Sequence, residues 1–167
     1  MKNKFIIANV QDLVKIMEII EAAKLRMQAE KLVQWQDDYP NQIIILEDIK
    51  KKQLYKYEIA GQIAGICVIN SDFYEQYPPY GLPAKGQVIH RLVVAPNFLR
   101  QGIGTTLFQA SEKLIKEQGY EYILVDTNTL NNKMCKLIEK NEYKALGEFE
   151  FIPNLPNWIL YQKKLKD

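Results

Sequence analysis

The chain has 167 residues, of which 47% are hydrophobic and 25% charged, a composition typical of one globular domain. Its net charge of +2 argues against nucleic acid and anionic membranes as partners. On its length we expect a single domain over residues 1–167. No apolar run has the length of a secretory leader or a membrane span, so we expect the protein in the cytoplasm.

The cysteine content also bounds the function. Cys67 and Cys135 stand far apart, and the chain has one histidine. This set does not match the ligand spacing of a common zinc site, so we expect no metal. Isolated cysteines favour a reducing compartment, in agreement with a cytoplasmic protein.

The apolar pattern of the first half predicts strands and helices in alternation. These elements are a strand at residues 4–10, a helix at 13–27, a loop at 33–41, a helix at 43–52 and strands at 54–60 and 62–70. The continuous apolar run at 43–52 leaves a strand possible there. Gly61, between the last two strands, predicts a hairpin turn.

The second half begins with a segment, residues 71–86, whose prolines argue against regular structure. The elements after it are a strand at 87–94, a helix from 103 that Gly119 closes, a strand at 122–127, a helix from Asn131 and strands at 143–152 and 158–165. A three-strand meander followed by a strand–helix–strand unit predicts an α/β fold with a mixed sheet and helices on both faces.

A buried strand, a glycine loop and a helix follow one another at the centre of the chain. The β-branched run from Val88 ends at Pro96, and Gly102 and Gly104 lie where the helix begins. Glycines let the backbone approach a ligand closely, and the free amides of a first helical turn attract an anion. The loop lacks the lysine of an NTPase phosphate loop, and Leu107 stands where a dinucleotide fingerprint has its third glycine. A plain turn stays open as an alternative.

This stretch is similar to motif A of the GNAT N-acetyltransferase superfamily. In that family the loop has glutamine or arginine, two variable residues, glycine, one variable residue, and glycine or alanine, and it binds the pyrophosphate of acetyl-coenzyme A. Gly102 and Gly104 match the two small residues, whereas Leu99 stands at the glutamine or arginine position with Arg100 after it. The resemblance continues from Asn131 to Tyr143.

The resemblance implies a mostly antiparallel central sheet of about seven strands. Strands four and five, here residues 87–94 and 122–127, would splay apart and hold the pantetheine arm between them. The implied coenzyme-binding residues are Leu92, Val93, Val94, Leu99, Arg100, Gln101, Gly102, Ile103, Gly104, Thr105 and Asn131. The backbone amide of Val93 would stabilise the oxyanion, while a plain helix cap is the alternative role for Asn131.

One departure from the family concerns the general acid. The family tyrosine that protonates the leaving thiolate corresponds to Ile138, which has no proton to give. Water or another side chain would have to protonate the thiolate, or the chain would lack full activity. We interpret Tyr143, at a phenylalanine position of the family, as a core residue.

The candidate general base is His90, the histidine of the central strand. Simple alternation places its side chain on the face of Leu92 and Val94. Histidine accepts protons near neutral pH, which suits the deprotonation of an amine. A structural histidine is the alternative, and we expect Arg91 to pair with a carboxylate.

The acceptor site is expected in loops that carry aromatic and acidic residues. The candidates are Trp35, Asp37, Asp38, Tyr39 and Tyr80, with Tyr74 and Tyr77 close by in the sequence. Aromatic rings beside carboxylates suit a cationic amine, and Asp37 or Asp38 could act as the base through a water. Packing over the sheet edge is the alternative role for each tyrosine.

We therefore expect an acetyl-coenzyme A-dependent N-acetyltransferase that transfers acetyl directly to a primary amine of a small molecule or peptide. We expect a monomer or homodimer. One alternative is an acyltransferase for a longer acyl group. The other is a coenzyme A-binding regulatory or interaction domain without catalysis.

Overall fold

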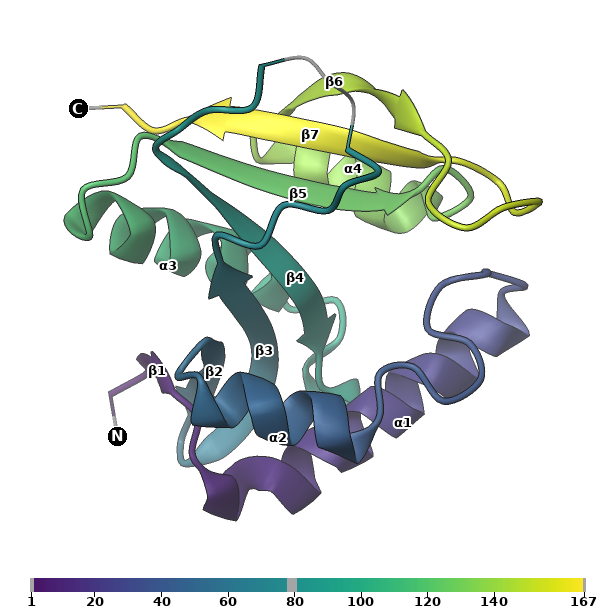
Figure 1. The fold of residues 1–167 in the computed structure, drawn as a ribbon. Helices are drawn as coiled ribbons and strands as arrows, with labels where there is room; N and C mark the ends of the chain where they lie inside the picture. The colour runs from purple at the N-terminus through teal and green to yellow at the C-terminus, as the bar shows by residue number, and fades with distance from the viewer. Residues whose placement is uncertain (1, 78–80, 167) are drawn as a thin grey trace. The chain divides into compact units, whose positions relative to one another are not determined.

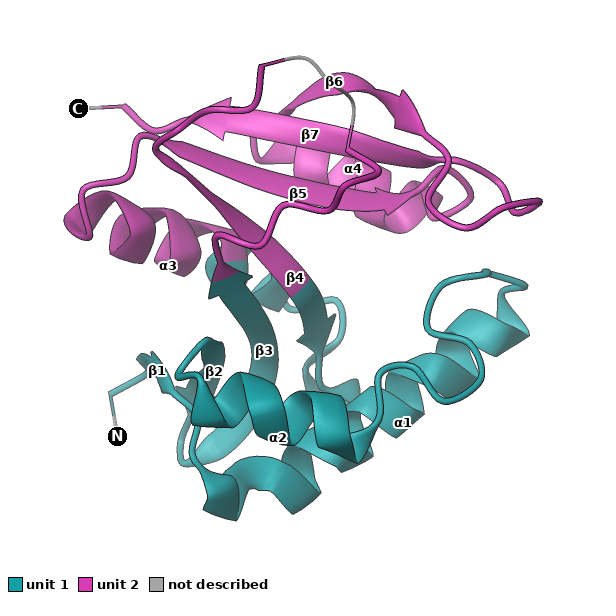
Figure 2. Ribbon diagram, in the orientation of Figure 1, with its two compact units in different colours: residues 1–69, 91–107 teal, residues 70–90, 108–167 magenta. Residues whose placement is uncertain are grey.

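The computed structural model describes residues 2–77 and 81–166. The chain forms two compact units: Met1–Ile69 with Arg91–Leu107 make unit 1, and Asn70–His90 with Phe108–Asp167 make unit 2 (Figure 2). The expectation of one functional domain over residues 1–167 stays a prediction.

The sheet contains seven strands in the order β1-β2-β3-β4-β5-β7-β6 (Figure 1). The strands are β1 (Lys4–Ile7), β2 (Leu54–Ile59), β3 (Gln62–Asn70), β4 (Gly86–Val94), β5 (Tyr122–Asn128), β6 (Lys144–Phe149) and β7 (Trp158–Lys164). The helices are α1 (Leu13–Ala29), α2 (Gln42–Lys50), α3 (Ile103–Glu117) and α4 (Asn132–Lys140), with 3-10 turns η1 (Val10–Asp12) and η2 (Pro96–Phe98). β4 and β5 run parallel, whereas β1–β2, β2–β3, β5–β7 and β6–β7 are antiparallel. This confirms the predicted mixed, mostly antiparallel fold.

Local chemistry accounts for the turns that the sequence predicted. Ala60 and Gly61 join β2 to β3 with φ of +49° and +77°, the left-handed conformation of a two-residue hairpin turn. Gly119, at φ +86°, ends α3: its amide bonds to the Lys116 carbonyl, and the Tyr120 amide bonds to the Ile115 carbonyl. Asn41 caps α2, since its side chain accepts from the Ile44 amide at 3.0 Å. The segment that could have been a strand is therefore a helix.

Two predicted strands were too long. The first ends at Ile7, because Asn9 and Asp12 form a capping box that starts η1. The strand predicted at 143–152 is β6 (Lys144–Phe149), which has an irregularity between Ala145 and Gly147.

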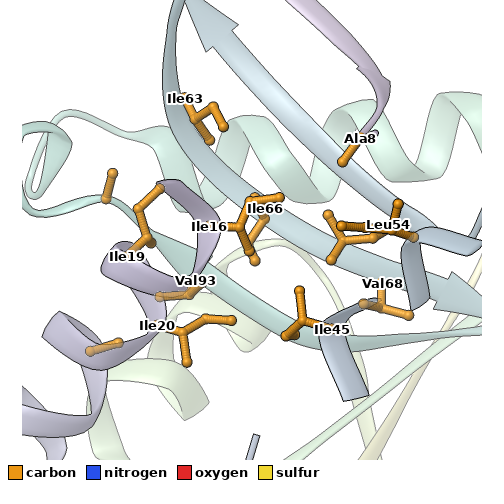
Figure 3. Close-up of a cluster of buried hydrophobic side chains, with 13 residues drawn as sticks. Ala8, Ile16, Ile19, Ile20, Ile45, Leu54, Ile63, Ile66, Val68 and Val93 are labelled. Atoms are coloured by element: carbon orange, nitrogen blue, oxygen red, sulfur yellow. The ribbon is translucent and has the colours of Figure 1, made fainter. Parts of the chain in front are cut away.

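The core of unit 1 consists of aliphatic side chains from the helices and strands of that unit (Figure 3). Ile16 and Ile20 from α1, Ile45 from α2, Leu54 from β2 and Ile66 from β3 are fully buried. Each such side chain contributes about 1.5–3 kcal/mol when it leaves water, so this cluster fixes α1 and α2 on the strands.

Unit 2 has its own buried set. Ile123 and Leu124 of β5, Leu160 and Tyr161 of β7 and Ile138 of α4 are all at most 1% exposed. Among the residues that the structure describes, no helix combines the length and apolarity needed to cross a membrane.

Candidate functional site

The loop between β4 and α3 lies in unit 1 and has left-handed residues directly before the helix. Arg100 and Gly102 adopt φ of +60° and +76°, and α3 begins at Ile103. A Cβ placed on Gly102 would meet no atom within 4 Å, so the space beside this backbone is open. The Gly102 carbonyl accepts from the Thr106 amide at 3.0 Å, which closes the first turn. An open backbone next to the amides of a first helical turn suits phosphate oxygens.

The predicted coenzyme residues of this loop are consecutive in one exposed turn. Leu99, Arg100, Gln101 and Gly102 are exposed, whereas Ile103 and Gly104 are buried and Thr105 is half-buried. The Gln101 side chain donates to the Asn97 carbonyl at 2.9 Å and so braces the loop.

Gly65 of β3 lies directly under the start of α3. A Cβ there would be 2.8 Å from Leu107 Cδ1, 3.0 Å from the Val93 carbonyl oxygen and 3.3 Å from Ile103 Cγ2. The absence of a side chain therefore lets the first turns of α3 approach the strands closely. The sequence reasoning did not single out Gly65.

Arg91, also in unit 1, is the centre of a buried polar network in β4. Its Nε and Nη2 donate to the two carboxylate oxygens of Asp48, each at 2.8 Å, and its Nη1 donates to the Tyr39 hydroxyl at 2.9 Å. The side chains of Arg91 and Asp48 are 9% and 8% exposed. The predicted pairing of Arg91 with a carboxylate is confirmed.

Burial and partners act in opposite directions on this pair. Burial raises the pKa of the Asp48 carboxyl, although the Arg91 guanidinium opposes the shift. Burial alone would lower the pKa of Arg91, but Tyr39 and Asp48 outweigh it, and the pKa is raised. The guanidinium therefore stays charged. The cost of removing both charges from water is offset by the hydrogen bonds and the attraction between Arg91 and Asp48.

The backbone of β4 is irregular at Arg91, whose φ is +50°. The assignment of His90 to the face of Leu92 and Val94 used simple alternation, and a left-handed residue between them interrupts that alternation. Alternation therefore does not establish which face His90 shares, and its placement with Leu92 and Val94 stays a prediction. Val93 is buried, Leu92 and Val94 are half-buried, and the Val94 carbonyl accepts from Arg26 at 3.2 Å. The role of the Val93 amide stays a prediction.

The candidate acceptor residues of the α1–α2 loop have mixed surroundings. Trp35 packs against the core of unit 1, and the Tyr39 hydroxyl accepts from Arg91. Asp37 and Asp38 are exposed, and the Asp38 carboxylate accepts from the Asn41 side chain at 2.8 Å. The aromatic pair thus has structural contacts, whereas the carboxylates face solvent. Tyr80, another candidate, lies outside the described residues.

His90 belongs to unit 2 and is 7% exposed. Its Nε2 lies 2.9 Å from Asn70 Oδ1, an oxygen that also accepts from the Asp72 amide. Because that oxygen can only accept, Nε2 of His90 carries the proton in this bond. The Tyr74 ring packs edge-on against the imidazole, with centroids 5.1 Å apart. His90 is therefore held from two sides.

Asp126 of β5, in the same unit, was missed by the sequence reasoning. The Tyr77 hydroxyl donates to its Oδ2 at 2.5 Å. Burial raises the pKa of the Asp126 carboxyl to about 6, and the Tyr77 hydrogen bond opposes that shift. Its position inside the otherwise apolar run from Tyr122 to Thr127 was the available clue.

The α4 region settles the local roles of three predicted residues. The Asn131 side chain accepts from the Met134 amide at 3.1 Å, so it caps α4. Ile138 is fully buried. Tyr143 is 4% exposed and its ring packs on Phe108, which confirms it as a core residue. A coenzyme contact of Asn131 stays a prediction.

A search of the described residues for three or more His, Cys, Asp or Glu side chains able to share a metal ion found no such group. Neither Cys67 nor Cys135 is in a disulfide within the part of the chain that the structure describes.

Comparisons with known proteins agree on one family. A family model described as the acetyltransferase (GNAT) family matches residues 16–143. A search of curated protein sequences found no match.

Similar solved structures include a GNAT-family acetyltransferase of Streptococcus agalactiae, 22% identical, with a TM-score of 0.82 over 99% of this chain and 96% of that one. A GNAT-family acetyltransferase of Listeria monocytogenes is 20% identical, with a TM-score of 0.77 over 98% and 95%. The PaiA N-acetyltransferase of Thermoplasma acidophilum, solved with coenzyme A, is 18% identical, with a TM-score of 0.72 over 98% and 99%.

Proposed function

Because the chain belongs to the acetyltransferase (GNAT) family, and is thus an acyltransferase, we propose that it moves an acetyl group from acetyl-coenzyme A to a primary amine of a small molecule or peptide. The observation that carries the proposal is the β4–α3 loop of unit 1. There the open backbone at Gly102 stands beside the amides of the first turn of α3. This arrangement fits a pyrophosphate, which needs close backbone approach and hydrogen-bond donors.

The coenzyme would be held by backbone more than by side chains. We propose that residues 99–105 bind the pyrophosphate, that Leu92, Val93 and Val94 pair with the pantetheine arm, and that Asn131 contacts the coenzyme besides capping α4. Arg100 supplies an exposed positive charge next to the loop, although Leu99 occupies the position where the family has a polar side chain. When bound, acetyl-coenzyme A supplies an acetyl group already activated as a thioester. The two isolated cysteines, Cys67 and Cys135, support a cytoplasmic location.

The α1–α2 loop is the proposed acceptor-binding segment of unit 1. The exposed carboxylates of Asp37 and Asp38 would attract a cationic amine. Trp35 and Tyr39 would fix the conformation of the loop, because both already have partners within the unit. Tyr80 stays a proposed acceptor residue on the strength of the sequence alone.

Two proton transfers accompany the reaction. The acceptor must lose a proton before its nitrogen can attack, and the leaving thiolate must gain one. His90 is the base proposed from the sequence. Ile138 is buried and apolar, so the thiolate would take its proton from the nitrogen that has attacked the carbonyl carbon, or from water.

Thermal unfolding with acetyl-coenzyme A tests the coenzyme site. At a hundredfold excess over the dissociation constant, binding stabilises the fold by about 2.7 kcal/mol, which raises Tm by roughly 5–10 °C for a protein of this size. Gly104→Asp places a side chain and a negative charge in the first turn of α3 and should abolish the shift. Gly61→Asp is the control, because it makes the same change in the β2–β3 turn, away from the proposed site. Its φ of +77° makes an aspartate there strained, so the shift of each variant is measured against its own Tm without coenzyme. Equal shifts in both variants would place the coenzyme elsewhere.

Release of free coenzyme A thiol tests the transfer. The substrates are acetyl-coenzyme A and a longer acyl-coenzyme A, each with spermidine, tyramine and an alanine tripeptide. Amine-dependent thiol release with the acetyl donor supports the proposal. A preference for the longer donor would indicate a different acyl group. Coenzyme binding without turnover of any amine would indicate a binding domain, which is the reading that Ile138 favours.

A further inference from the structure

We propose that Asp126 accepts the proton of the acceptor amine and that Tyr77 is its positioning residue. The inference rests on the proposed function and replaces His90 as the base. Both residues belong to unit 2, so the argument uses contacts within one compact unit.

The first observation is the place of Asp126 in the sheet. The parallel ladder between β4 and β5 runs from Gly86 opposite Tyr122 to Ile89 opposite Val125. Asp126 is the next residue of β5, where it still pairs with Leu160 of β7. It therefore stands on a strand that is fixed on one side, at the point where pairing with β4 has ended.

The second observation is its access to solvent. Val125 and Thr127 are buried, whereas Asp126 between them is partly exposed. Tyr77, itself 5% exposed, donates to Oδ2. Within the part of the chain that the structure describes, this is the one side-chain hydrogen bond that the carboxylate accepts, and it leaves Oδ1 without a described side-chain partner. A catalytic base needs a fixed orientation and one oxygen that the substrate can reach.

The third observation is the aromatic lining. The Tyr77 ring contacts Tyr74 and Phe149, each with centroids 5.4 Å apart, and Tyr74 contacts Phe151 at 5.0 Å. This cluster fixes the Tyr77 ring, and an ammonium group that reached a free ring face of the cluster would be attracted to it.

Among the residues that the structure describes, the titratable group in contact with Asp126 is Tyr77, and Leu160 of β7 is its strand partner. Tyr74 packs on Tyr77, and His90 of β4 packs on Tyr74, so these two groups lie one and two contacts further away. Burial raises the pKa of the Asp126 carboxyl to about 6. A base with that pKa is ionised at neutral pH yet basic enough to relay a proton.

His90 is less suited to the task. It is buried, its Nε2 proton is donated to Asn70, and its ring is packed by Tyr74. These contacts describe a histidine that holds β3 and the segment before β4 together. Asp126, by contrast, accepts one side-chain hydrogen bond, from Tyr77, and the residue is partly exposed.

The proton balance of the step is complete. The ammonium of the acceptor gives one proton to the Asp126 carboxylate. The free amine then forms the N–C bond to the thioester carbonyl carbon, and the C–S bond breaks. The nitrogen loses its second proton to the departing thiolate, which leaves as coenzyme A thiol. Asp126 returns its proton to solvent, so one amide, one thiol and one proton are formed.

Asp126→Asn tests the proposal, because asparagine keeps the shape and can still accept from Tyr77. With the alanine tripeptide and spermidine as acceptors, kcat/KM should fall by roughly 10²–10⁴. Acetyl-coenzyme A affinity should change by less than about twofold. In the unmodified protein, log(kcat/KM) should bend near pH 6, the pKa of the Asp126 carboxyl, and in Asp126→Asn this bend should be absent. Glu121→Gln, which removes one carboxylate just before β5 from an exposed ion pair with Lys85, is the matched control and should change neither quantity.

Tyr77→Phe tests the positioning role with a readout that loss of packing alone would not move. Loss of the hydrogen bond removes an interaction that holds the carboxyl pKa down, so the bend should move to higher pH. If Tyr77→Phe lowers Tm but leaves the bend at the same pH, Tyr77 contributes only packing, and its positioning role is overturned.

The outcomes separate this inference from the proposed function. An active Asp126→Asn protein with its bend intact overturns the inference and leaves the acetyltransferase proposal standing. Loss of the bend in His90→Gln, with retention in Asp126→Asn, returns the role to His90. An unmodified protein that binds acetyl-coenzyme A and turns over none of the amines overturns the proposed function, and this inference with it.

Discussion

The ion pair between Arg91 and Asp48 provides the sharpest test of what holds unit 1 together. Asp48→Asn removes the negative charge, keeps the side-chain shape and leaves the guanidinium buried with one neutral partner. Both side chains are less than 10% exposed, and two hydrogen bonds of 2.8 Å join them. Breaking a buried pair of this kind costs about 3–5 kcal/mol, because the remaining charge has lost its compensation.

Urea unfolding at pH 7 measures this loss in the free energy of unfolding. Thermal unfolding should show the same loss as a lower Tm, by roughly 6–20 °C at about 2–4 °C per kcal/mol for a chain of this length. The double replacement of Asp48 by Leu and Arg91 by Met should recover most of the loss, since no unpaired charge remains. Glu121→Gln breaks an exposed pair and should cost less than about 1 kcal/mol. A loss below about 1 kcal/mol for Asp48→Asn, or a double variant as unstable as the single one, would refute the reasoning.

Three further outcomes are expected. Gly65→Ala should destabilise the fold by about 1–3 kcal/mol, because its Cβ would press on the Val93 carbonyl and on Leu107, and it should weaken acetyl-coenzyme A binding in a calorimetric titration. Ile138→Ala should cost about 2–5 kcal/mol in urea unfolding, since the side chain is fully buried, with little change in turnover per folded molecule. Asp38→Asn should raise KM for cationic amines more than KM for acetyl-coenzyme A, and equal effects on both would leave the loop as scaffold.

Local rules allowed the sequence to predict much of the fold. The β2–β3 turn depends on Gly61 and its neighbour, and the end of α3 depends on Gly119. In both places a glycine with positive φ determines the backbone locally, so a few residues of sequence are enough to predict the feature. The β4–loop–α3 unit was also readable, because an apolar β-branched run, two glycines and a helical repeat follow one another directly.

The polar networks were harder to predict because their partners are distant in sequence. Asp48 and Arg91 are 43 residues apart, and Tyr77 and Asp126 are 49 apart. Alternation along β4 cannot be extended past Arg91, where a left-handed residue interrupts the strand. A partial clue did exist: Asp48 is three residues after Ile45 and so falls on the buried face of α2. A charged residue on an apolar face requires a partner, but the sequence does not say which one.

The pH dependence of stability separates a functional Asp126 from a structural one. Its carboxyl has a pKa of about 6 in the fold, against about 3.9 for an ordinary aspartate, so the native state binds the proton more tightly than the unfolded chain. The resulting stabilisation is complete below about pH 4 and is lost as pH rises through 6.

Asp126→Asn cannot ionise and lacks this dependence. From pH 5 to pH 8 its stability should therefore rise by roughly 1–2 kcal/mol relative to the unmodified protein, measured as urea midpoints at both pH values. A carboxylate selected for stability would show the opposite trend, because its ionised form would be the one that the fold prefers. A carboxylate that the fold holds ionised at a cost to stability is a candidate functional residue. A stability difference that does not change with pH would show that the carboxyl titrates at its ordinary value, and the case for Asp126 as the base would fail with it.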